Sequence, residues 1–275
     1  MKITKPIITL ALALITLTAC QNDALDDTGT QMRDINISIP ALQTATRTTT
    51  DPNNPLKTTW DVGDVVYISV IDFYSLEFIA KLTAQLTDTG WQFSSKLQVP
   101  MERQAIHIDA TYIGNHQPGE LCFDTDVLYS GIGYSLRGVP DEVTFTLREF
   151  NHFCPRIRFT GLAEGDQIEF QGNQWNKITV NASDYGLGIE TFATTDHLTV
   201  ASGQDEAVVY VYIYPRGTTA PQFRINGGEW YTFDYGTPNP DGSAYNNRTY
   251  TIDCAALFGG GGIADMPQLV SNPLP

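Results

Sequence analysis

The 275-residue chain lacks the short motifs by which many enzymes are recognised. It contains no His-Glu-x-x-His metal motif and no Gly-x-Ser-x-Gly nucleophile motif. Gly131-x-Gly133 is not followed by the third glycine of a dinucleotide-binding loop, and no lysine stands in a phosphate-binding loop. We therefore expect no catalytic residues and no cofactor. A hydrolase with two carboxylates is the least favoured alternative, because nothing in the sequence selects a particular pair.

Histidine is scarce, and its spacing does not indicate a metal site. The four histidines are His107, His116, His152 and His197. We expect His152 to be packed or hydrogen-bonded rather than catalytic. Asp124 and Asp126 form a carboxylate pair that could contact Ca²⁺, but further loop ligands are not evident. Asn239-Pro240-Asp241-Gly242 is typical of a turn. The sequence therefore predicts no metal.

Basic residues are few, with 16 Lys and Arg against 31 Asp and Glu and a formal net charge of −15. Lys2 and Lys5 lie in the first 19 residues, which contain no acidic residue. A chain without those residues has a formal net charge of −17 instead of −15. A chain this acidic is repelled by nucleic acid and by anionic lipid surfaces, and no basic stripe offsets the repulsion. We therefore expect no nucleic-acid partner.

Cysteine is also scarce, with four residues in the chain. Cys122, Cys154 and Cys254 lie far apart and show no Cys-x-x-Cys spacing. Three thiols allow one disulfide at most, and burial as small apolar side chains is the favoured interpretation.

The chain has one long apolar run near its start, Pro6 to Leu17, which follows two lysines. This order is typical of an export signal, and the run is too short to span a bilayer comfortably. It ends in Leu17-Thr18-Ala19-Cys20, which resembles a bacterial lipobox. That resemblance implies a signal peptide over residues 1–19, cleavage between Ala19 and Cys20, and a lipid on Cys20 that binds the membrane. An ordinary signal peptide cut near Ala19 is the alternative.

Beyond the leader, residues 20–32 are polar and acidic, which indicates a flexible tether. Alternation of apolar and polar residues then predicts half-buried strands. Val65–Ile71 and Val208–Tyr214 are apolar on both faces and predict central strands. Asn226-Gly227 predicts a hairpin turn, and no amphipathic helix longer than about two turns is evident. The pattern predicts an all-β sandwich fold rather than parallel α/β. The alternating segments begin at Ile35, Phe78, Ile106, Val143, Phe223, Tyr231 and Tyr250.

Gly161 to Asp166 is the expected boundary between an N-terminal domain, residues 33–162, and a C-terminal domain, residues 163–258. Residues 259–275 form a glycine linker and a tail with three prolines. The tail is either disordered or an extended segment awaiting a partner, and the first is favoured because termini are usually loose.

Tryptophan and tyrosine residues permit two interpretations. Trp91, Trp175 and Trp230, together with Tyr210, Tyr212 and Tyr214, could form a platform that binds a glycan or host ligand. Cross-strand packing in the core is favoured, since aromatic side chains in sandwiches usually pack there.

Several segments together resemble the fimbrillin-like lipoproteins of Bacteroidales, the subunits and accessory proteins of type V pili. They are Thr46-Arg47-Thr48 after an isoleucine-rich strand, Thr59-Trp60-Asp61-Val62-Gly63-Asp64, the stretch Phe150 to Phe159, and a closing set at Val208–Pro215, Phe223–Gly228 and Asn247–Ile252. The resemblance implies two transthyretin-like β-sandwich domains in tandem, a place on the outer membrane and a role in adhesion. Where the family's histidine-led strand often has Ala-Lys, this chain has Pro155-Arg156.

In polymerising members of this family a protease cuts after an arginine near the first strand, and a neighbour's segment fills the vacated groove. Arg47 is the residue that matches the cleavage position here. The resemblance then implies loss of Asp34–Ala41 and assembly with other pilus subunits by strand addition. If no cut occurs, an anchor or minor subunit is implied. A surface lipoprotein that holds a glycan or host ligand is the alternative.

Overall fold

The computed structural model describes residues 31–42, 59–173, 175–193, 195–213, 221–233 and 249–258. The chain divides into a unit of Met1–Gln31 and a unit of Met32–Pro275, and all of the strands belong to the second. Ala19, Cys20, Arg47 and the tail after residue 258 lie outside the described residues. The predictions made for them are therefore not tested by the fold.

The all-β prediction is confirmed for the described residues, which form twenty strands and one short helix, α1 (Cys254–Phe258). None of these residues belongs to a helix with the length and apolarity needed to cross a membrane. The alternating segments expected from the sequence fall in strands because each puts every second side chain into a core.

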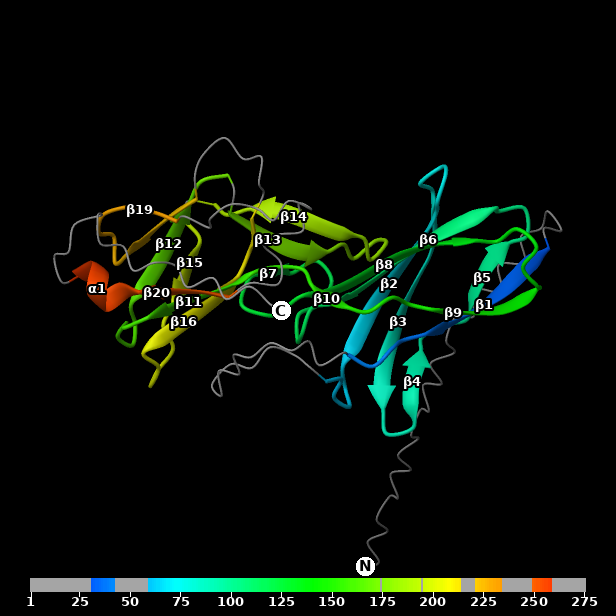
Figure 1. The fold of residues 1–275 in the computed structure, drawn as a ribbon, viewed down its shortest axis with the longest axis horizontal. Helices are drawn as coiled ribbons and strands as arrows, with labels where there is room; N and C mark the ends of the chain where they lie inside the picture. Colours follow the sequence, from blue (N-terminus) through cyan, green and yellow to red (C-terminus); the bar gives the residue numbers. More distant parts are fainter. Residues whose placement is uncertain are drawn as a thin grey trace, which may run out of the picture. The chain divides into compact units, whose positions relative to one another are not determined.

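Two sheets face each other in the first sandwich (Figure 1). The smaller has the order β5-β1-β9 and the larger the order β10-β8-β6-β2-β3-β4. The strands are β1 (Met32–Ser38), β2 (Val65–Asp72), β3 (Phe78–Thr87), β4 (Gly90–Phe93), β5 (Leu97–Pro100), β6 (Ala105–Tyr112), β8 (Leu128–Ser135), β9 (Glu142–Thr146) and β10 (Asn151–His152). Strand β2 lies between β6 and β3, as its two apolar faces predict. Ile35 and Ile37 of β1 pack with Ile68 of β2 in this core.

The second sandwich repeats this arrangement with sheets of order β16-β11-β20 and β15-β12-β18-β19. Its core includes Ile157 and Phe159 of β11 and Phe170 of β12. The strands are β11 (Arg156–Thr160), β12 (Gln167–Gln171), β15 (His197–Thr199), β16 (Glu206–Tyr210), β18 (Gln222–Ile225), β19 (Tyr231–Thr232) and β20 (Thr249–Asp253).

A further sheet, β14-β13-β17, carries β7 beside β13 and contributes to a third group of buried residues. Its strands are β7 (Leu121–Cys122), β13 (Trp175–Val180), β14 (Leu187–Thr191) and β17 (Tyr212–Ile213). The third group includes Tyr67 and Ile178, and so draws on both halves of the chain.

The apolar run at Val208–Tyr214 corrects one expectation. The chain leaves β16 at Tyr210 and enters β17 at Tyr212, and these strands pair with β11 and β13 respectively. One long central strand was therefore the wrong interpretation. Val209, Tyr210 and Val211 of this run are buried, and Tyr212 is half-buried in the other sheet.

The chain passes from the six-stranded sheet to the second sandwich between β10 and β11, ahead of Gly161. Gly161 itself adopts a positive φ of 71° in the turn after β11, a conformation that suits glycine. That the chain forms two separate domains with a boundary at Gly161–Asp166 stays a prediction. The turn predicted at Asn226-Gly227 is confirmed, since both residues have positive φ, 52° and 69°.

Candidate functional site

Strand β1 occupies the centre of its three-stranded sheet, with a partner on each side. It runs antiparallel to β5, where Ile35 lies opposite Leu97. It runs parallel to β9, where Ile37 lies opposite Phe145. Both backbone edges of β1 are therefore engaged, and its removal would expose the facing edges of β5 and β9.

Side chains of β1 alternate between the core and the outer face. Ile35 and Ile37, and Ile39 just beyond the strand, are buried, whereas Asn36 and Ser38 are exposed. Burying an isoleucine side chain contributes about 1.5–3 kcal/mol each. The strand is thus held by the three isoleucines and by its two ladders of hydrogen bonds.

Trp60 fixes the chain just after β1. Its indole Nε1 donates a hydrogen bond to the Pro40 carbonyl oxygen at 2.9 Å. The Trp60 ring packs edge-on against Trp91 and Phe150, with ring centroids 5.3 and 5.1 Å apart. Trp91 is therefore part of an aromatic cluster that closes one end of the first core, which agrees with the favoured packing interpretation.

Arg33 is the least well satisfied group of β1. It is 4% exposed. Its Nε and Nη2 donate to the carbonyl oxygens of Pro140 and Val139 at 3.1 and 3.3 Å. Its Nη1 is buried without a hydrogen-bond partner, and no carboxylate of the described residues forms an ion pair with it. A buried cation without an anion is costly, so Arg33 weakens the hold on the start of β1.

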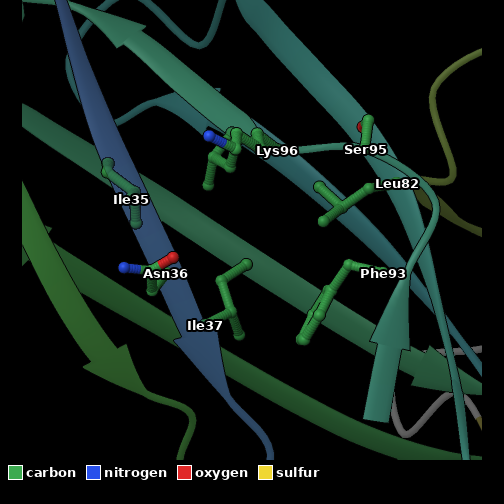
Figure 2. Close-up of a pocket in the computed structure, with 8 residues that line it drawn as sticks. Ile35, Asn36, Ile37, Leu82, Phe93, Ser95 and Lys96 are labelled. Atoms are coloured by element: carbon green, nitrogen blue, oxygen red, sulfur yellow. The ribbon is translucent and has the colours of Figure 1, made fainter.

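A cavity of about 430 Å³ borders β1 on the side of β3 and β4. Figure 2 shows Ile37, Leu82 and Phe93 turned toward this space, with Ser95 and Lys96 around it. Unfilled space beside an apolar side chain forfeits dispersion contacts. A larger side chain at the position of Ile37 would therefore gain contacts in this pocket.

Trp175 and Trp230 do not join Trp91 in a single platform. Trp175 is fully buried, and its Nε1 donates to the Gln222 carbonyl oxygen at 2.9 Å. A ligand cannot reach this ring, so the ligand-binding expectation for Trp175 is wrong and the packing alternative holds. Trp230 is half-buried under the Arg224 guanidinium, whose central carbon lies 4.6 Å from its ring centroid.

The two carboxylates weighed as Ca²⁺ ligands bind different histidines. Asp124 contacts Nε2 of His116 at 2.7 Å, and Asp126 contacts Nδ1 of the buried His152 at 2.6 Å. Among the described residues no group of three His, Cys, Asp or Glu side chains is arranged to hold a metal. His152 is hydrogen-bonded and buried, as expected.

Cys122, Cys154 and Cys254 are free and buried. Burial, with nearby carboxylates, raises the pKa of Cys122 and of Cys254 to about 12. It also raises the pKa of Cys154. All three are therefore protonated and unreactive at neutral pH, which supports their interpretation as small apolar side chains.

Solved structures similar to this chain include fimbrial and pilin proteins. A fimbrial assembly protein from Parabacteroides distasonis is 11% identical, with 82% of this chain and 90% of that chain covered and a TM-score of 0.39. The tip fimbrial protein Mfa3 from Porphyromonas gingivalis is 11% identical, with coverages of 70% and 89% and a TM-score of 0.34. The shaft pilin spaA from Lactobacillus rhamnosus GG is 12% identical, with coverages of 80% and 96% and a TM-score of 0.30.

No family model and no curated protein matches the chain. All three TM-scores lie below 0.5.

The sequence pointed to the first strand but not to the details of its site. The contact between Trp60 and Pro40, the hydrogen bonds of Arg33 to distant carbonyl oxygens and the pocket beside β1 all join residues distant in sequence, and no local pattern predicts them. The only sequence signal for this site was Arg33, because the alternation of Ile35 and Ile37 places residue 33 on the buried face of the strand.

Proposed function

We propose that this protein is a fimbrillin-like lipoprotein of the cell surface, which serves as an anchor or minor subunit of a type V pilus and has a role in adhesion. A lipid on Cys20 holds it on the outer membrane, and its partners are other pilus subunits. The role is structural rather than enzymatic. The observation that carries the proposal is the place of β1, a central strand joined to β2 through a long connection that contains Arg47.

Cleavage at Arg47 would break the covalent connection between β1 and β2. Strand β1 would then be held by noncovalent contacts alone. Its loss would open a groove between β5 and β9 and uncover the sites of the three isoleucines. A strand from a neighbouring subunit then pairs with both edges and places alternate apolar side chains in those sites. Acylated but uncut chains keep β1 and remain attached to the membrane.

Two features of the site favour replacement of β1 by another strand. Arg33 buries a charge that has no carboxylate partner among the described residues, and the pocket beside Ile37 has room for a larger side chain. A strand with an apolar residue at the position of Arg33 and a larger one near Ile37 would bind more tightly than β1 itself. Exchange therefore proceeds toward the assembled state without an added energy source.

The test is the N-terminus and lipid state of the protein taken from cells, with and without Arg47→Ala. We expect lipid on Cys20 in the uncut chain, a new N-terminus after Arg47 in fibres, and loss of the cut form in the variant. Arg137→Ala, at an exposed arginine elsewhere, is the matched control and should be cut normally. Lipidated chains that are never cut would reject the polymerising form and leave the anchor. Unacylated chains found in no fibre would overturn the whole proposal.

A further inference from the structure

The outer face of the six-stranded sheet carries two glycines inside strand β8. Gly131 lies opposite Asp109, and Gly133 lies opposite His107 on the neighbouring strand β6. Glycine in the interior of a strand weakens it and often marks a place where another group approaches closely. These glycines are not part of a nucleotide-binding loop, so their positions need another explanation.

Aromatic rings lie across both glycines. A Cβ atom at Gly133 would come within 3.0 Å of Cε2 in the Phe73 ring, and a Cβ at Gly131 would overlap the hydroxyl oxygen of Tyr129. Phe73 also lies beside His107, with ring centroids 6.3 Å apart. The glycines thus form a floor on which the two rings rest close to the sheet.

Phe73 is presented by a structured loop between β2 and β3, drawn in cyan at the end of the sheet (Figure 1). The Asp72 carboxylate accepts hydrogen bonds from the backbone N–H groups of Tyr74 and Ser75, at 2.9 and 2.7 Å. Arg103 joins Asp72 to Glu77 by ion pairs of 3.2 and 2.8 Å. The Phe73 side chain nevertheless remains 49% exposed. An exposed ring held in place in this way is prepared for contact at little cost in entropy.

Two partly exposed polar side chains lie beside Phe73, His107 at 28% and Asp109 at 21%. One oxygen of Asp109, Oδ1, accepts from the Tyr129 hydroxyl and contacts Nε2 of His107 at 3.0 Å. Within the described part of the chain, the other oxygen, Oδ2, and the second ring nitrogen of His107, Nδ1, have no hydrogen-bond partner. An acceptor and a ring nitrogen therefore lie next to an exposed aromatic ring.

Another part of the same face is covered. Tyr67 of β2 packs against Tyr185, with ring centroids 5.3 Å apart, and Lys81 of β3 donates to the Ala182 carbonyl oxygen at 2.6 Å. Tyr67 is 6% exposed as a result. No described residue covers the region of this face around Phe73 in the same way. The Phe73 ring is nevertheless as well suited to packing as the Tyr67 ring.

We propose that Phe73, His107 and Asp109 form a binding site for an uncharged pyranose sugar of a glycan. The apolar face of the sugar ring stacks on Phe73, and its hydroxyls bond to Asp109 Oδ2 and His107 Nδ1. The Asp109 carboxylate and the net charge of −15 act against acidic sugars and anionic lipids. This site is independent of β1 and of the strand-addition proposal.

The test measures retention of the full chain on immobilised cellotetraose, mannotetraose and chitotetraose, with tetragalacturonate as the acidic comparison. We expect binding to at least one neutral tetrasaccharide and a loss of about tenfold or more with Phe73→Ala. Phe78→Ala is the matched control, because Phe78 lies at the end of the same loop and is 48% exposed. It should bind as the unchanged protein does.

Gly133→Ala provides a second test of the geometry. The added methyl would displace the Phe73 ring, so binding should weaken in the unchanged background and not weaken further when Phe73 is already alanine. In the unchanged protein the His107 imidazole resonances should shift on addition of the retained sugar. The proposal is overturned if no neutral tetrasaccharide is retained, if Phe73→Ala and Phe78→Ala bind alike, or if tetragalacturonate binds equally well.

Discussion

The two sandwiches use the same arrangement around their first strands but differ in how those strands are held. Strand β1 lies between an antiparallel partner, β5, and a parallel partner, β9. Strand β11 lies between an antiparallel partner, β16, and a parallel partner, β20. Strand β11 continues by short connections into β10 and β12, whereas β1 reaches its next strand only at Val65. One cut between β1 and β2 can therefore separate β1 from the remaining strands, but no single cut frees β11.

Charge differs between these strands as well. Arg33 in β1 is buried against two carbonyl oxygens, with no anion among the described residues. Arg158 in β11 donates to the Glu206 carboxylate of the neighbouring strand at 2.5 Å. The Arg158 guanidinium thus has a carboxylate partner on the neighbouring strand, whereas that of Arg33 has carbonyl oxygens as its partners among the described residues.

Removal of β1 should have the largest effect. A chain lacking residues 1–41 should lose the thermal transition of the first sandwich and keep that of the second, because β5, β9 and the isoleucine sites lose their partner. Differential scanning calorimetry measures this, and a chain lacking only residues 1–31 is the control. If both transitions survive, or both disappear, the two sandwiches do not differ as described.

Alanine at a core isoleucine should have the next largest effect. Ile37→Ala and Ile157→Ala should each lower the free energy of unfolding by about 2–5 kcal/mol in the uncut protein. In protein cut between β1 and β2, only Ile37→Ala should hasten the loss of β1. Urea denaturation and a retention assay for the β1 fragment measure the two quantities. Equal effects on retention would remove the distinction between the strands.

The same change should lower stability less at Arg33 than at Arg158. Arg158→Met leaves the partly buried Glu206 without its ion-pair partner and should cost about 1–3 kcal/mol. Arg33→Met removes a buried charge that has no carboxylate partner among the described residues, and should change stability by less than about 1 kcal/mol or raise it. Urea denaturation of both variants measures the difference, and a larger loss for Arg33→Met would show that Arg33 fastens β1.

The sequence predicted the strands whose apolar residues alternate, because a half-buried strand has this period whatever its partners are. It did not predict where the run Val208–Tyr214 changes sheets, since an apolar residue carries no information about which sheet buries it. It offered Trp91, Trp175 and Trp230 as candidate ligand-binding aromatics, with packing in the core as the favoured interpretation. The exposed large apolar side chains of the β2–β3 loop are Phe73, Tyr74 and Leu76, which come after the end of β2.

Lowering the pH should produce the smallest difference in stability between the two sandwiches. Backbone N–H bonds, led by that of Ser75, lower the pKa of Asp72, and the hydrogen bond from Arg224 lowers the pKa of Glu169. Both contributions are complete above the ordinary carboxyl pKa and are lost as pH falls through the lowered values. Salt screens the Glu169–Arg224 pair more than it affects the amide bonds of Asp72.

High salt should therefore reduce the loss of stability at low pH that depends on Glu169. It should not change the loss of stability that depends on Asp72. Urea denaturation between about pH 2 and pH 6, with Asp72→Asn and Glu169→Gln as the variants that remove each titration, measures both. Equal salt dependence of the two would contradict the assignment.

Exchange of the first strand is the most direct measurement. Protein cut between β1 and β2 is incubated under native conditions with an isotope-labelled peptide of residues 32–42, and the mass of the bound strand is tracked by native mass spectrometry. The account predicts that the labelled peptide replaces β1 while the second sandwich keeps its amide protection. A peptide carrying phenylalanine at the position of Ile37 should replace it more completely. Failure of any added peptide to replace β1, with the original fragment permanently bound, would contradict the account.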